Sequence, residues 1–163
     1  KERLNTANLL IDSGDYKSAA NRSYYAAFSA MRAVLALDGL DFKKHSGVIA
    51  EFRKSYIKTG IFNPEMSHII DSLKDVRQSS DYDDFYLIFK EEVLEQVESA
   101  LFFVNEIEKY WDGKISGLFL EEVKDWFRAR KHKKEWEIKF SQLMLSLFFS
   151  ILQLLKRLMQ AIP

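Results

Sequence analysis

The sequence contains no cysteine among its 163 residues. Disulfides, zinc sites built on thiolates and cysteine nucleophiles are therefore excluded. A chain without disulfides fits a reducing compartment, so we expect a cytoplasmic protein. Proline occurs twice and glycine six times, which is too few for the many tight turns of a β-sandwich or a β-barrel.

Several motifs of common enzyme classes are also missing. The sequence has no Gly-rich phosphate loop and no Gly-x-Ser-x-Gly elbow. Asp81, Asp83 and Asp84 form an acidic group, but their spacing is not that of an EF-hand loop, and we interpret the group as a solvated face. The sequence therefore predicts neither a metal site nor a cofactor.

The formal net charge is zero, but the charges are distributed unevenly. Residues 1–112 carry 14 Lys and Arg against 19 Asp and Glu, whereas residues 113–163 carry 10 against 5. An acidic body attracts nucleic acid poorly, so any phosphate contact within it must be local. The basic tail either binds a polyanion or neutralises the body.

Apolar residues make up 47% of the chain and recur at helical spacing, which predicts a fold with a sizeable core. The fifth expected helix turns Val93, Val97, Leu101, Val104 and Ile107 to one side. The polar stretch 79–84 is expected to break or fray the fourth. The expected helices cover residues 2–12, 16–38, 45–58, 64–78 and 88–111. We predict an all-α protein, an antiparallel bundle of four to five helices with a C-terminal helical extension.

The best candidate boundary is Asp112-Gly113-Lys114, where the composition changes, and it divides the chain into a bundle of residues 1–112 and an extension of residues 113–163. Within the extension, residues 118–131 and 136–160 are expected to be helical. Residues 140–155 carry no charge, but this run is shorter than the ~20 residues that span a bilayer. Its polar residues share one helical face, which favours burial or dimerisation over attachment to a membrane.

Three blocks of residues point to a known family. They read NRSYYAAF at 21–28, HSGVI at 45–49 and RQSSDY at 77–82. In this order and at these distances they resemble the small stand-alone prokaryotic proteins of the HEPN superfamily. The resemblance covers about residues 3–110 and leaves the C-terminal extension without a counterpart.

The resemblance implies a helical bundle that forms a homodimer, so that two copies of the site face each other. It also implies a nucleotidyltransferase as partner protein, in a toxin–antitoxin or defence setting. In the ribonuclease members, an arginine is followed after four to six residues by a histidine, and RNA is cleaved without a metal. There the histidine exchanges a proton with the ribose or the leaving group, while the arginine stabilises the charge on phosphorus.

This sequence departs from that motif at the histidine. Four residues separate Arg77 from Tyr82, which stands where the histidine is expected, and none of the three histidines follows an arginine at the required spacing. A tyrosine with a pKa of about 10 is a poor general base at neutral pH. Arg77 and Tyr82 are therefore the candidate catalytic residues of a motif that is not intact. A ribonuclease using Tyr82 or His45 remains an alternative function.

A site that binds phosphate without cleaving RNA does not need the missing histidine, but only groups that contact the phosphate. Arg77 and Asp81 are four residues apart, so they share a helical face, either as the core of a site or as an ordinary surface pair. Arg22 and Tyr25 belong to another helical stripe and would add a cation and an aromatic surface. His45 is expected at the start of a helix. Its two alternative roles are to donate a proton at the site and to cap the helix. The cap, by His45 or Ser46, is favoured.

We therefore predict a domain that binds a nucleotide or an RNA phosphate through Arg22, Tyr25, His45, Arg77 and Asp81. A metal-independent endoribonuclease and a purely structural dimerisation bundle are the alternatives.

Overall fold

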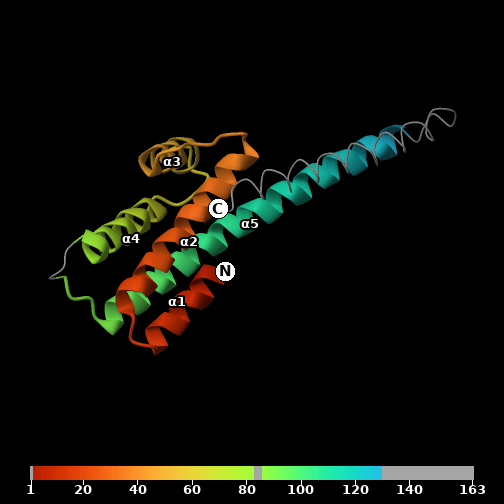
Figure 1. The fold of residues 1–163 in the computed structure, drawn as a ribbon. Coiled ribbons are helices and arrows are strands. Elements are labelled where there is room, and N and C mark those ends of the chain that lie inside the picture. The colour runs from red at the N-terminus through yellow and green to blue at the C-terminus, as the bar shows by residue number, and fades with distance from the viewer. Residues whose placement is uncertain (1, 83–85, 130–163) are drawn as a thin grey trace. The chain divides into compact units, whose positions relative to one another are not determined.

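The computed structural model describes residues 2–82 and 86–129, with side chains for residues 2–81 and 86–124. Within these ranges the chain consists of helices and their connections, without a β-strand, so the predicted all-α bundle is confirmed (Figure 1). The predicted helix 136–160 lies outside the described residues. The elements are α1 (Glu2–Asp12), α2 (Tyr16–Leu37), α3 (His45–Phe52), the π-helical turn η1 (Arg53–Ile57), α4 (Glu65–Tyr82) and α5 (Lys90–Ala129).

A tight turn reverses the chain between α1 and α2. Gly14 has a φ of +81°, a conformation that glycine adopts without steric cost. The next residue, Asp15, is the N-cap of α2, and its carboxylate accepts a hydrogen bond of 3.2 Å from the backbone N–H of Ser18. This turn lays α1 and α2 side by side (Figure 1).

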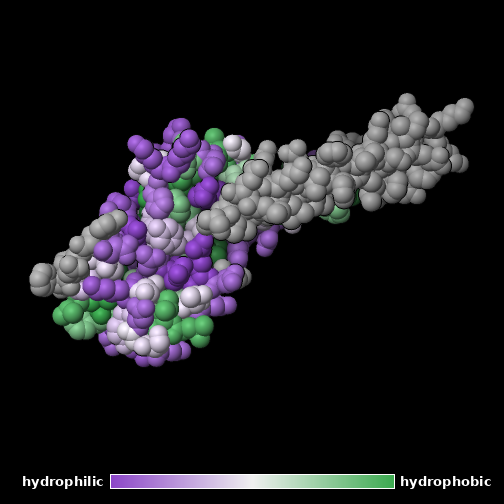
Figure 2. Space-filling view, viewed as in Figure 1, coloured by the Kyte–Doolittle hydropathy of each residue, from purple (hydrophilic) through white to green (hydrophobic). Residues whose placement is uncertain are grey.

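Helix α2 is the centre of the first part of the bundle, because it packs against α1, α3 and α4. Its inward residues are buried, as the sequence predicts: Ala20, Tyr24, Ala27, Phe28, Met31, Val34 and Leu35. Because apolar residues such as these are buried, hydrophilic residues cover most of the visible described face in Figure 2, and hydrophobic residues form small patches on it.

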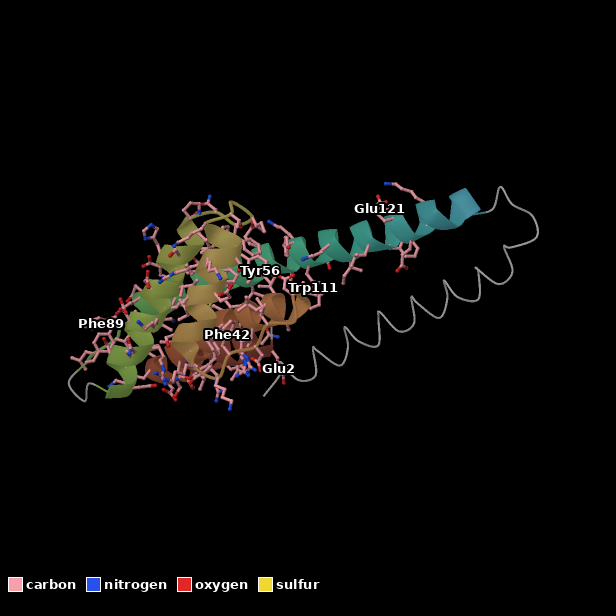
Figure 3. All side chains as sticks on the ribbon, turned by 90° about the horizontal axis from the view of Figure 1, so that it is seen from above. Glu2, Phe42, Tyr56, Phe89, Trp111 and Glu121 are labelled. Atoms are coloured by element: carbon pink, nitrogen blue, oxygen red, sulfur yellow. The ribbon has the colours of Figure 1, made fainter. Side chains whose placement is uncertain are left out.

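A cluster of aromatic rings lies in the core. The ring of Phe52 lies 5.6 Å, centroid to centroid, from each of the rings of Tyr56, Phe62 and Phe103. The buried hydroxyl of Tyr56, labelled in Figure 3, donates a 3.0 Å hydrogen bond to the carbonyl of Val34 and also contacts Asp38. The aromatic cluster thereby joins α3, η1 and α5, and Tyr56 ties it to the C-terminal end of α2.

Two helices extend further than the sequence predicts. Helix α4 continues through the polar stretch to Tyr82 instead of fraying after residue 78. Ser80 is buried, and Asp81 binds Arg77 and Asn21, so tertiary contacts hold this last turn. Helix α5 continues past Gly113 and Gly117 to Ala129 instead of ending at residue 111, since each glycine costs a helix only about 1 kcal/mol.

The chain divides into two units, Lys1–Ile107 and Glu108–Pro163. The division at residues 112 and 113 stays a prediction. In the described portion of the second unit, Ile115, Leu118, Phe119 and Leu120 are exposed along α5. Among residues 2–82 and 86–129, no helix is both long and apolar enough to cross a membrane.

One predicted core residue of α5 is wrong. Leu101 is 42% exposed, while Ala100 and Phe103 are completely buried. The regular spacing that selected Leu101 overlooked Phe103, whose ring fills the space beside Phe52.

Replacing Phe103 with alanine is expected to lower the free energy of unfolding by about 3–5 kcal/mol, because it leaves a cavity in the aromatic cluster. The matched control is its neighbour Phe102, which is 40% exposed and whose replacement is expected to cost about 1 kcal/mol or less. Urea denaturation followed by circular dichroism measures both values. Equal losses for the two variants would contradict the assignment of the core.

Candidate functional site

The candidate site lies where three elements meet: α2, the start of α3 and the last turn of α4. We call it the Arg77 cluster, and it contains Asn21, Tyr24, Tyr25, Phe28, His45, Arg77 and Asp81. All of its members belong to the first unit. Consecutive turns of α2 supply four of them, because positions three, four and seven residues apart share a helix face.

Arg77 is held on several sides. Its guanidinium carbon lies 5.9 Å from the ring centroid of Tyr24 and 5.8 Å from that of Tyr25. Its Nη2 donates to Oδ2 of Asp81 at 2.8 Å, and the side chain is 19% exposed. Asp81 also accepts a 3.2 Å hydrogen bond from Nδ2 of Asn21. Arg77–Asp81 is therefore more than an exposed surface pair, because it connects α4 to α2.

His45 lies against the same face of α2. Its imidazole stacks on the ring of Phe28 with 4.0 Å between centroids, and Nδ1 lies 3.1 Å from the hydroxyl oxygen of Tyr24. The edge of the Tyr25 ring is also near, with 5.9 Å between centroids. These contacts fix the plane of the imidazole, although the residue itself is exposed to solvent.

The surroundings change the proton affinity of both partners in this hydrogen bond. Although His45 as a residue is exposed, partial desolvation of its imidazole lowers its pKa below the usual value of 6.5, and the positive charges of Arg77 and Arg32 lower it further. Burial raises the pKa of the Tyr24 hydroxyl, against an opposing effect of Arg77. At neutral pH the imidazole is therefore mainly neutral, while the phenol keeps its proton.

Most, but not all, of the predicted site residues come together. Tyr25, His45, Arg77 and Asp81 are members of the cluster. Arg22 is exposed one helical turn before Tyr25, and no described contact joins it to Arg77. Tyr82 is the last residue of α4, but its side chain lies outside the described part of the structure. The functional role of these residues stays a prediction.

The favoured assignment of a capping residue is wrong. The N-cap of α3 is Lys44, without a hydrogen bond from its side chain, and His45 is the first residue of the helix. The imidazole is thus directed to α2 by its contacts with Tyr24 and Phe28.

Three members of the cluster were missed as site residues. Tyr24 and Phe28 belong to the expected apolar face of α2, and both are indeed buried. The signal for Tyr24 is its hydroxyl, since a buried tyrosine normally finds a hydrogen-bond partner. Asn21 gives no such signal in the sequence, because its partner Asp81 is 60 residues away.

The described residues offer no arrangement typical of a metal site. Among the side chains of residues 2–81 and 86–124, no group of three or more His, Asp or Glu is placed to hold an ion. The cluster instead combines one half-buried cation, two phenol rings and a neutral imidazole. Such groups hold anions through charge and hydrogen bonds, and the imidazole can exchange a proton.

Fold and site together define a small helical-bundle domain whose central helix presents tyrosines to an arginine and a histidine. The chain belongs to the HEPN domain family, whose sequence model matches residues 1–110. This match agrees with the resemblance of the three sequence blocks.

Curated relatives support the assignment. A UPF0332 protein of Thermotoga maritima is 37% identical over 109 residues, which are 67% of this chain and 83% of the relative. A protein of Methanocaldococcus jannaschii named "Putative toxin" is 34% identical over 110 residues, or 68% of this chain and 75% of the relative. A UPF0332 protein of Pyrococcus horikoshii is 40% identical over 60 residues, covering 37% and 42% of the two chains.

Replacing Arg77 with glutamine is expected to raise the pKa of His45 toward 6.5, because a positive charge that opposes the imidazolium is removed. Arg32→Gln should act in the same direction but more weakly. The measurement is an NMR titration of the imidazole protons.

Arg22→Gln provides the matched control, since Arg22 is not among the groups that shift His45. An unchanged or lowered pKa in Arg77→Gln would show that the guanidinium does not act on the imidazole.

Proposed function

We propose that the chain is a HEPN-type domain that binds the phosphate of a nucleotide or of RNA at the Arg77 cluster. The observation that carries this proposal is the placement of Arg77 between Asp81 and the two tyrosine rings. These contacts hold the guanidinium in one orientation, so the side chain loses less conformational entropy when it binds a phosphate.

The electrostatic setting supports a local anion site. The body of residues 1–112 is acidic, but Arg32 and Arg77 both act on His45, so at least two cations lie near it. Exposed Arg22 extends the positive charge along α2. The partly exposed Tyr25 adds an aromatic surface on which a base can stack. Phosphate binding would therefore depend on this face of α2 rather than on net charge.

Competition with Asp81 is the main obstacle to phosphate binding. The Arg77–Asp81 pair is formed through Nη2 of the guanidinium, and a bound phosphate would compete with this carboxylate. Asp81 also accepts from Asn21, so it does not depend on Arg77 alone for hydrogen bonds. Asp81 therefore keeps a hydrogen-bond donor when a phosphate takes its place at Arg77.

The biological setting is proposed from the family. Two relatives from Methanocaldococcus jannaschii carry toxin names, and one of them matches 82 residues of this chain at 33% identity. We accordingly place this chain in the cytoplasm as a toxin-like component with a nucleotidyltransferase partner. Purification of the chain together with the product of its neighbouring gene tests that partnership, and failure to form a complex would contradict it.

A metal-independent endoribonuclease is the second candidate, and the position of His45 favours it. This chain lacks the histidine that the family's ribonuclease motif has after the arginine, but α3 brings the imidazole of His45 to the same cluster. A mainly neutral histidine can accept a proton from a ribose hydroxyl, and a nearby guanidinium can stabilise the phosphorane. In this candidate, His45 takes the role for which Tyr82 is chemically unsuited.

Arg77→Ala is expected to weaken the binding of a labelled RNA oligonucleotide by at least about tenfold, since a charge-assisted contact is worth roughly 1.5–3 kcal/mol. Arg77→Lys should lie between this variant and the native protein, because lysine keeps the charge but loses the planar fork. Fluorescence anisotropy gives the affinities, and gels run after incubation in chelator detect cleavage in the same samples.

The matched control is Lys58→Ala, which removes an exposed cation at the far end of η1. Equal binding by native protein and Arg77→Ala would contradict the phosphate site. Cleavage in chelator that disappears in both Arg77→Ala and His45→Gln would establish the ribonuclease. If the native protein binds the RNA but does not cleave it, the result supports a binding domain without ribonuclease activity.

A homodimer is part of the proposal, and α5 offers a surface for it. Leu94 and Leu101 are 41% and 42% exposed and seven residues apart. Val97 and Val104 follow the spacing typical of helices that pack against each other, but both are already buried within the chain. The exposed pair Leu94 and Leu101 is therefore the surface that we assign to a second copy of the chain.

Light scattering is expected to give twice the chain mass of 19.1 kDa for the native protein and a shift toward monomer for Leu101→Glu, which places a charge in the interface. Leu9→Glu is the matched control, because Leu9 is 69% exposed on a different helix. A monomeric native protein would contradict the dimer.

A further inference from the structure

His45 is placed where its charge and an anion at Arg77 must influence each other. Helix α2 turns Tyr24, Tyr25 and Arg32 toward it, and α4 contributes Arg77. Among the charged neighbours of these groups, Asp81 pairs with Arg77 and Asp41 pairs with Arg32 at 3.1 Å. Lys43 and Lys44 precede His45 in its own segment.

In the free protein, the cations dominate the field at the imidazole. Arg77 and Arg32 oppose its protonation although each has a carboxylate partner. A phosphodiester bound at Arg77 adds a negative charge at short range, which offsets the positive charge of the guanidinium and so favours protonation of the imidazole. The protonated imidazole would also offer the anion a charge-assisted hydrogen bond.

The contact with Tyr24 allows the ring to change its charge without moving. A hydroxyl donates to Nδ1 when this nitrogen is unprotonated and accepts from it when it carries a proton. The ring of Phe28 also accepts both states, because an imidazolium stacked on its face is held there by cation–π attraction. Both states of the imidazole therefore fit the same position, so its protonation does not require a rearrangement of the bundle.

We propose that anion binding at the Arg77 cluster is coupled to the uptake of one proton by His45, so that the site holds phosphodiesters more tightly as the pH falls. This inference rests on the proposed function and adds its regulation. It follows from linkage: if a bound phosphate favours the imidazolium, protonation favours the phosphate by the same factor. The affinity rises as the pH falls through the higher pKa of the complex and levels off below the pKa of the free protein.

The test uses a short oligouridylate, whose phosphodiesters and bases carry no titrating proton between about pH 5.5 and 8.5. Its affinity for the native chain is measured by fluorescence anisotropy at constant ionic strength across this range. We expect the affinity to increase toward acid pH, by about tenfold for each unit that separates the pKa of His45 in the complex from that in the free protein. His45→Gln should bind with an affinity that does not vary with pH.

Two controls make the result specific. His68→Gln removes an exposed histidine from α4 and should keep the pH dependence of the native chain. An NMR titration of native His45, with and without saturating sulfate, should give a higher pKa in the presence of the anion.

The outcomes separate the inference from the function on which it rests. Binding that depends on Arg77 but is equally strong at all pH values would overturn the coupling and keep the site. A pH dependence that survives in His45→Gln would also overturn it. Absence of binding at every pH would remove the proposed function together with the inference.

Discussion

The half-buried guanidinium of Arg77 is the interaction on which the candidate site depends. A charge taken partly out of water needs compensation, and among the described residues the Asp81 carboxylate and the rings of Tyr24 and Tyr25 contribute to it. Because the tyrosines lie on α2 and the arginine on α4, this compensation also fixes one helix against the other. Asn21 adds a second connection by its hydrogen bond to Asp81.

Helix α2 serves the core and the site with adjacent residues. Tyr24 is the clearest example, because its ring is buried in the bundle while its hydroxyl lies 3.1 Å from His45. The neighbouring Tyr25 is less buried and presents its ring to Arg77. A residue such as Tyr24 couples stability to chemistry, since a change in packing at its ring would move the hydroxyl that holds the imidazole.

The positions of the helices follow from the sequence more closely than their ends do. Burial of Met31, Val34 and Leu35 agrees with the helical spacing, because a regular pattern of apolar residues needs no information from distant segments. The end of α4, in contrast, depends on a distant segment of the chain. The stretch at residues 79–82 is polar and would fray alone, but distant Asn21 holds Asp81 within the helix.

The sequence by itself determined the all-α class, the helical core faces and the pairing of Arg77 with Asp81, because these depend on residues within a few turns of each other. Only the tertiary structure decided that Tyr24, His45 and Arg77 meet, since they come from three elements and no local rule relates residues 21 or more positions apart. It also decided that His45 turns to α2 instead of capping its own helix, because stacking on Phe28 and the hydroxyl of Tyr24 offer the imidazole partners there.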